Sequence, residues 1–152
     1  MKKNIYILCV FCLLSFSARA QEMDFKGLKL ALAQRATVIE ENTNVIEYEL
    51  DGLRIYLITD ESANRMRLMS AVQEESKLTL EDLTILMKAN FDRALDAKYA
   101  ISNGVLWSVY AHPLRELTKE QATDAMYQVK NLVNNYGTTY TSTDFVFGGD
   151  DN

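Results

Sequence analysis

Cysteine is nearly absent from this sequence of 152 residues, and the two that occur, Cys9 and Cys12, both lie within residues 1–20. That segment has a basic start, an apolar run too short to cross a bilayer and an Ala-Arg-Ala ending at Ala20, which together form a secretory signal. Cleavage after Ala20 leaves a mature chain without a thiol, which excludes a disulfide, a cysteine nucleophile and a thiolate metal site. We therefore expect a periplasmic or secreted protein.

Positive charge and histidine are also scarce. Removing the three basic residues of the signal from the 16 in the whole chain leaves 13 against 21 acidic residues, so the formal charge changes from −5 to −8. A surface of this sign is a poor partner for nucleic acid. His112 is the single histidine, so a multi-histidine metal site is excluded, and its place before Pro113 favours a strand end over a general base.

Motifs for nucleotide, phosphate and metal binding are missing from the mature chain. It contains no GxGxxG, Walker or GxSxG sequence. The pairs Asp60-Glu61 and Asp150-Asp151 lack the alternation of an EF-hand loop, which leaves weak calcium binding as an open alternative. The sequence thus predicts no catalytic residue, no metal site, no cofactor and no membrane span in the mature chain.

Two hairpin signals stand out among the features that are present. Asp51-Gly52 and Asn103-Gly104 each favour a two-residue type I′ turn, because both central positions need a positive φ. With the register of the first turn, the hairpin over 45–58 has one apolar face and one polar face. With the register of the second, the hairpin over 98–110 has two rather apolar faces. Alternation over 65–72 predicts a third strand between them.

Three helices are predicted around these strands. Asp24 is a possible cap for the first, over residues 21–36, and Thr79 caps a second helix that is apolar over more than one stripe. The third starts at the capping box of Thr118 and ends at Gly137.

The expected fold is α+β, with element order α-β-β-β-α-β-β-α. It has a single antiparallel sheet of about five strands, with the first and last helices on one face. Residues 21–137 form this domain after the signal peptide of 1–20, and residues 138–152 are expected to be a flexible tail. Residues 37–44 could end the first helix, add a short strand or form a connection.

Two groups of side chains offer alternative functions. The carboxylates Glu47, Glu49 and Asp51 could serve a small envelope hydrolase, although solvated strand faces often carry such clusters. An aromatic group could instead line the cavity of a small-ligand carrier, although such residues more often belong to a core or an interface. The aromatic group consists of Tyr48, Trp107 and Tyr110.

Four local patterns resemble one known family. They are the Asp51-Gly52 turn before an alternating strand, Asn90-Phe91 in the second helix, Tyr99-Ala100 at a strand start and Leu117-Thr118 at the entry to the last helix. Together they resemble the YbjN-type branch of the type III secretion chaperone-like fold, over residues 44–136. This resemblance implies an α+β domain that tends to form homodimers and binds a protein or peptide partner without chemistry.

The leading interpretation is therefore an exported, non-catalytic, chaperone-like or regulatory binding module. Its apolar side chains exceed what three helices and one sheet face can cover, which predicts a twofold homodimer. The expected partner or dimer surface consists of Met87, Phe91, Val105, Trp107 and Val109. As an alternative, the tail around Phe145-Val146-Phe147 could fold back over the same surface.

Overall fold

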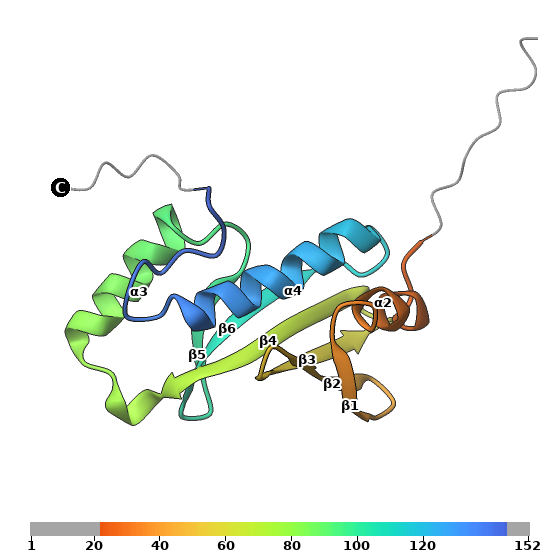
Figure 1. The fold of residues 1–152 in the computed structure, drawn as a ribbon, viewed down its shortest axis with the longest axis horizontal. Coiled ribbons are helices and arrows are strands. Elements are labelled where there is room, and N and C mark those ends of the chain that lie inside the picture. Colours follow the sequence, from red (N-terminus) through yellow and green to blue (C-terminus); the bar gives the residue numbers. More distant parts are fainter. Residues whose placement is uncertain (1–21, 146–152) are drawn as a thin grey trace, which may run out of the picture.

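The computed structural model describes residues 22–145, in which six strands form one antiparallel sheet with three α-helices packed around it (Figure 1). The predicted signal peptide over 1–20 lies outside the described residues, as do residues 146–152 of the predicted tail. The elements are α2 (Phe25–Leu32), β1 (Thr37–Glu41), β2 (Val45–Leu50), β3 (Leu53–Asp60), β4 (Arg65–Glu74), the 3-10 turn η1 (Glu75–Lys77), α3 (Leu80–Asp92), β5 (Lys98–Ser102), β6 (Val105–His112) and α4 (Lys119–Asn134). The α+β class is confirmed.

Both hairpins have the register that their turns predict. Asp51 and Gly52 have φ of 50° and 83°, and Asn103 and Gly104 have φ of 52° and 76°, as a type I′ turn requires. Tyr48 consequently lies opposite Ile55 in the first hairpin, and Ala100 lies opposite Trp107 in the second. The strand order β1-β2-β3-β4-β6-β5 joins the two hairpins through the pairing of β4 with β6.

The sheet has six strands instead of about five, because residues 37–41 form β1 at one edge. Val38 pairs with Tyr48, and a bulge at Ile39 shifts the register before Glu40. Only Val38 is even partly buried in β1, so the strand lacks the alternation of apolar and polar residues that would have identified it. Bulges and charged residues are common at edge strands, where they discourage pairing with another chain.

One face of the sheet is buried beneath α2 and α4, which lie side by side on it (Figure 1). The three helices begin at the predicted caps, and Thr79 and Thr118 each form a complete capping box. The core on this face includes Leu28, Leu32, Ile46, Tyr48, Ile55, Leu57, Leu68, Leu106, Met126 and Leu132. No helix within residues 22–145 is both long and apolar enough to cross a membrane.

The first hairpin turn gives a test of this register. Replacing Gly52 with Ala should lower the free energy of unfolding by roughly 1–2 kcal/mol, because an L side chain is strained at positive φ. A Cβ at Gly52 would meet no atom within 4 Å, so the loss reflects the backbone alone. Gly52→Asn is the matched control and should cost clearly less in urea unfolding, since Asn tolerates this conformation; equal losses would contradict the turn type.

Candidate partner-binding surface

The three most exposed large apolar side chains of residues 22–145 lie on α3. Leu80, Met87 and Phe91 are 84%, 70% and 85% exposed. Their spacing places them on one side of the helix. They line a groove that is formed by α3 alone, whose residues are Leu80, Leu83, Thr84, Met87, Lys88, Phe91 and Asp92.

The opposite side of α3 is buried along only a narrow stripe. Leu86 and Ala89 are its buried residues. Burying one leucine contributes about 1.5–3 kcal/mol, and an alanine adds less. The helix therefore depends on polar contacts to hold its place beside the sheet.

Asn90 supplies the main polar contact between α3 and the sheet edge. The Tyr99 backbone N–H donates to Asn90 Oδ1 at 2.8 Å, and Asn90 Nδ2 donates to the Tyr99 carbonyl at 2.9 Å. Both main-chain groups on the outer side of β5 at Tyr99 are thereby satisfied, as a neighbouring strand would satisfy them. The Asn90 side chain thus fixes α3 to β5 and closes that edge at this residue.

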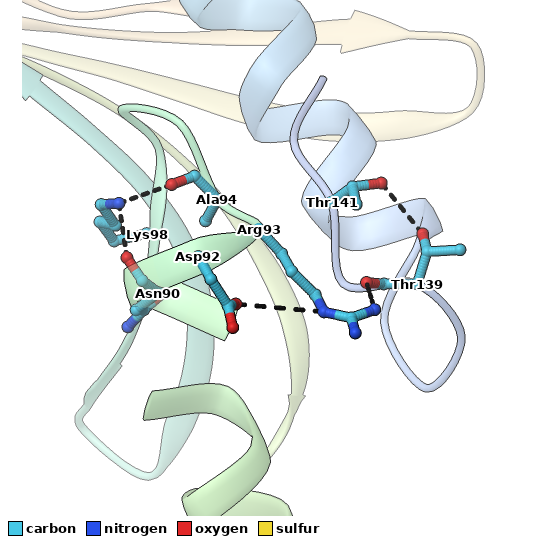
Figure 2. A network of polar contacts seen from close by, with 7 residues as sticks. All are labelled: Asn90, Asp92, Arg93, Ala94, Lys98, Thr139 and Thr141. Atoms are coloured by element: carbon cyan, nitrogen blue, oxygen red, sulfur yellow. Dashed lines mark hydrogen bonds and ion pairs between the residues drawn. The ribbon is translucent and has the colours of Figure 1, made fainter. Parts of the chain in front are cut away.

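Lys98 of β5 forms further hydrogen bonds to α3 and to the segment after it. Its Nζ donates to the carbonyls of Asn90 and Ala94, both at 2.6 Å, near the C-terminal end of α3 (Figure 2). Burial lowers the pKa of Lys98 from its usual value, and the nearby Asp96 carboxylate opposes that shift. A cation at a helix C-terminus also interacts favourably with the helix dipole.

A buried glutamine connects α4 to the loop that follows α3. Gln128 Oε1 accepts from the backbone N–H groups of Asp96 and Ala97, at 3.0 and 3.1 Å. Its Nε2 donates to Asp124 at 2.7 Å. Because buried amides are costly when unpaired, this side chain fixes the path of the chain from α3 into β5.

The chain after α4 returns to the end of α3. Leu95 N–H donates to Ser142 Oγ at 2.7 Å, and Asn131 Nδ2 donates to the Ser142 carbonyl at 2.9 Å. Arg93 reaches the Thr139 carbonyl at 3.4 Å (Figure 2). Residues 139–142, which belong to the predicted flexible tail, are therefore attached to the domain in the structure.

Three tyrosines pack where this segment meets β5. Tyr99, Tyr136 and Tyr140 contact one another edge to face, with ring centroids 6.0–6.4 Å apart. Tyr140 has a φ of 57°, an unfavourable conformation that the surrounding rings support. The Tyr99 hydroxyl also donates to the Leu132 carbonyl at 2.7 Å, so the cluster is tied to α4 as well.

The other predicted surface residues lie on the face of the sheet opposite α4. Val105, Trp107 and Val109 alternate along β6 and are half-buried. Trp107 contacts Tyr56 edge to face with centroids 6.3 Å apart, and its Nε1 donates to the Ser102 carbonyl at 3.1 Å. The five predicted residues therefore form two groups, one on this sheet face and one, Met87 with Phe91, in the α3 groove.

The carboxylates of the hydrolase alternative each have a structural partner. Glu47 forms an ion pair with Arg54, and Asp51 forms one with Lys130. Glu49 Oε1 accepts from the Gly52 N–H at 2.7 Å, within the turn itself. The Glu47 and Glu49 contacts lie within the first hairpin, whereas the Asp51 contact joins its turn to α4.

The aromatic cavity of the carrier alternative does not form. Tyr48 and Tyr110 are buried in the core between the sheet and its helices. Trp107 lies three residues before Tyr110 on β6 and points to the opposite face, because side chains alternate along a strand. These three residues therefore do not line one cavity, and Tyr48 and Tyr110 have the core role that is more common for such side chains.

The remaining polar candidates are also accounted for. His112 is the last residue of β6, as predicted, with Nδ1 2.7 Å from the Pro113 carbonyl. Within residues 22–145, no group of three or more His, Asp or Glu side chains is placed to hold a metal ion. The acidic pair Asp150-Asp151 lies outside the described residues.

No family model matches this chain, and no curated protein does. A chain in the solved structure of the HopA1-SchA chaperone-effector complex is similar to it, with a TM-score of 0.53 and 10% sequence identity. The similarity covers 65% of this chain and 79% of that chain. At this identity the likeness concerns the fold. The predicted α+β fold with a single antiparallel sheet is confirmed, and it is shared with a chain of that complex.

The attachment of α3 to β5 can be tested at Asn90. Asn90→Ala should lower the free energy of unfolding by about 1–3 kcal/mol, because two main-chain groups of Tyr99 lose their partner. Asn134→Ala, on an exposed position of α4, is the control and should change stability by no more than about 0.5 kcal/mol. Equal effects of the two substitutions in urea unfolding would contradict the proposed attachment.

Burial of Tyr99 predicts a loss of stability at high pH. Burial, with smaller effects of Tyr140 and Tyr136, raises the pKa of Tyr99 above its usual 10.0. Above about pH 10 the unfolded chain loses a proton that the folded chain keeps, so stability falls as pH rises, by up to ~1.4 kcal/mol per pH unit. Tyr99→Phe should make this slope shallower between pH 9 and 11. Tyr127→Phe, at an exposed position, should leave it unchanged; an unaltered slope in Tyr99→Phe would refute the assignment.

Proposed function

We propose that this protein is an exported, non-catalytic, chaperone-like module that binds a protein or peptide partner. The observation that carries the proposal is the α3 groove, where Leu80, Met87 and Phe91 are largely exposed. Contiguous apolar surface of this kind is unusual on a monomer and generally marks a binding site. Methionine and aromatic side chains are also common anchors of protein interfaces.

The similarity of fold supports the same class of function. The comparable chain belongs to a complex of a chaperone with an effector. The residue patterns from Asp51-Gly52 to Leu117-Thr118 favour assignment to the YbjN-type branch of this fold. The signal over residues 1–20 favours a periplasmic or secreted location, which distinguishes the proposal from a cytoplasmic secretion chaperone.

A non-catalytic role agrees with the contacts of the polar side chains. The three carboxylates of the hydrolase alternative serve the first hairpin through Arg54, Gly52 and Lys130. The exposed apolar residues of α3 and the half-buried ones of β6 instead offer contact area. A second copy of the chain can cover the α3 groove through a twofold contact, in which each copy contributes the same residues.

Met87 tests this use of the groove. We expect the protein to dimerise at micromolar concentration, and Met87→Asp to raise the dissociation constant at least roughly tenfold, because a charge would be buried in the contact. Leu30→Asp is the control, since Leu30 is also exposed but belongs to α2. Sedimentation equilibrium measures both. A wild type that stays monomeric at all concentrations would exclude the homodimer.

A further inference from the structure

We propose that the face of the sheet opposite α2 and α4 binds an acidic amphipathic helix of a partner protein. This inference rests on the proposed function, and it assigns a second binding surface together with the class of partner that fits it. The centre of the surface is a group of apolar side chains on β3, β4 and β6, which we call the sheet-face strip. Its residues are Tyr56, Met69, Val105, Trp107 and Val109.

The sheet-face strip is accessible because the helices that cover the sheet lie on its other face (Figure 1). Side chains alternate along each strand, so the core residues Leu57, Leu68 and Leu106 project toward the helices and the strip projects away from them. All five strip residues are half-buried, and Ile58 beside them is 39% exposed. The strip therefore offers apolar area that residues 22–145 leave partly uncovered.

The two aromatic rings of the strip are held in fixed positions. Tyr56 and Trp107 pack edge to face with ring centroids 6.3 Å apart, across β4, where Ala71 opposite Trp107 has only a small side chain. Trp107 Nε1 donates to the Ser102 carbonyl at 3.1 Å, so the indole N–H is satisfied within the chain. Rings that are already ordered lose little conformational entropy on binding, and such aromatic residues are common anchors of protein interfaces.

Arg67 lies at one end of the strip without a partner of opposite charge. It is exposed on β4, and the residues opposite it on the two neighbouring strands are Ile58 and Ala111. Within residues 22–145 its guanidinium forms no hydrogen bond and no ion pair. An unpaired arginine beside an apolar area favours a partner that supplies a carboxylate, because hydrogen bonds between arginine and a carboxylate are among the strongest in protein contacts.

The acidic residue at this end of the strip is bound to its own turn. Asp60 lies opposite Arg65, the exposed arginine two residues before Arg67. Its Oδ1 accepts from the Ser62 hydroxyl at 2.6 Å and from the Ala63 N–H at 2.9 Å, which directs this oxygen toward the loop after β3. Two exposed guanidinium groups therefore stand at one end of the strip, in a chain whose 21 acidic residues outnumber its 16 basic ones.

The Tyr56 hydroxyl is a second donor of this surface, and among residues 22–145 it has no hydrogen-bond partner. Tyr56 pairs with Met69 and Arg67 pairs with Ile58, so Tyr56 and Arg67 are diagonal neighbours, roughly 7–8 Å apart. Residues four apart on a helix are about one turn, ~6 Å, from each other. Both donors are therefore within reach of two carboxylates on the same side of one helix.

The dimensions of the strip match an α-helix. β3 and β6 are separated by β4, which makes the strip two interstrand spacings or ~10 Å wide, and a helix with its side chains is about 10–12 Å across. Val105 and Val109 are four residues apart, ~13 Å along β6, which corresponds to about nine residues of a helix. A helix with apolar residues at i, i+3, i+4 and i+7 covers this length, with its acidic side at Arg65 and Arg67.

Trp107 is the single tryptophan of the chain, so its fluorescence reports on this surface alone. The probe is a synthetic helical peptide of about 14 residues, with leucine at i, i+3, i+4 and i+7 and glutamate beside this stripe; its counterpart has lysine in place of glutamate. The acidic peptide should shift the Trp107 emission to shorter wavelength and saturate, and the lysine peptide should bind at least tenfold more weakly. The absence of a saturable shift, or equal affinity of the two peptides, overturns the proposal.

Charge reversal at Arg67 tests where the acidic side of the peptide binds. Arg67→Glu should weaken binding of the acidic peptide at least tenfold, and Arg67→Lys, which keeps the charge, should weaken it less. Arg35→Glu is the matched control, because Arg35 is also exposed but lies in the turn after α2, and it should change the affinity less than twofold. Equal effects of Arg67→Glu and Arg35→Glu overturn the assignment.

A lipid surface and the α3 groove give different results in the same measurements. Vesicles of phosphatidylcholine and phosphatidylglycerol should leave the Trp107 emission unchanged, because the net charge of −5 opposes binding to an anionic membrane. A shift with vesicles but not with the peptide overturns the proposal in favour of lipid. Loss of the peptide signal while dimerisation persists in sedimentation equilibrium overturns the sheet-face site alone, and a peptide signal in a strictly monomeric protein contradicts the homodimer alone.

Discussion

The pair of hydrogen bonds between Asn90 and the main chain of Tyr99 determines where α3 lies, and the exposed surface of the protein follows from that position. Two helices, α2 and α4, already cover one face of the sheet. A third helix held at the edge by a side-chain amide needs little apolar burial of its own. Its outer residues are consequently free to form a groove, while the outer edge of β5 is closed at Tyr99.

The two edges of the sheet are protected in different ways. β5 is covered by α3, whereas β1 is short, bulged at Ile39 and ends in Glu40-Glu41. Both devices discourage a further strand from joining the sheet through its main chain. The proposed association through the α3 groove would avoid this problem, because a helix has no unpaired backbone groups along its side. The fold therefore directs binding toward side-chain contacts.

Much of the fold is predictable because short-range chemistry determines it. The type I′ turns at Asp51-Gly52 and Asn103-Gly104 set every strand pair of both hairpins, and the caps at Thr79 and Thr118 set the starts of two helices. β1 is not predicted, because an exposed edge strand needs no regular alternation of apolar and polar residues. The alternative of a cavity lined by Tyr48, Trp107 and Tyr110 does not form, because Trp107 and Tyr110 project from opposite faces of β6.

The surface itself is only partly predictable, for a related reason. Met87 and Phe91 can be selected from the apolar pattern of α3, but the pattern does not say whether the same chain covers them. Leu80 completes the groove and carries the same periodic signal. The hydrogen bonds of Gln128 and Ser142 join residues 31 to 47 positions apart in the sequence. No local sequence motif predicts contacts of this range.

These long-range contacts also explain why residues 139–142 lie beside the C-terminal end of α3. Gln128 fixes the loop after α3, and Ser142 then attaches the returning chain to that loop. The returning chain thus passes the end of α3 where Phe91 and Asp92 line the groove. A surface that is apolar enough to bind a partner is also apolar enough to need cover when the partner is absent.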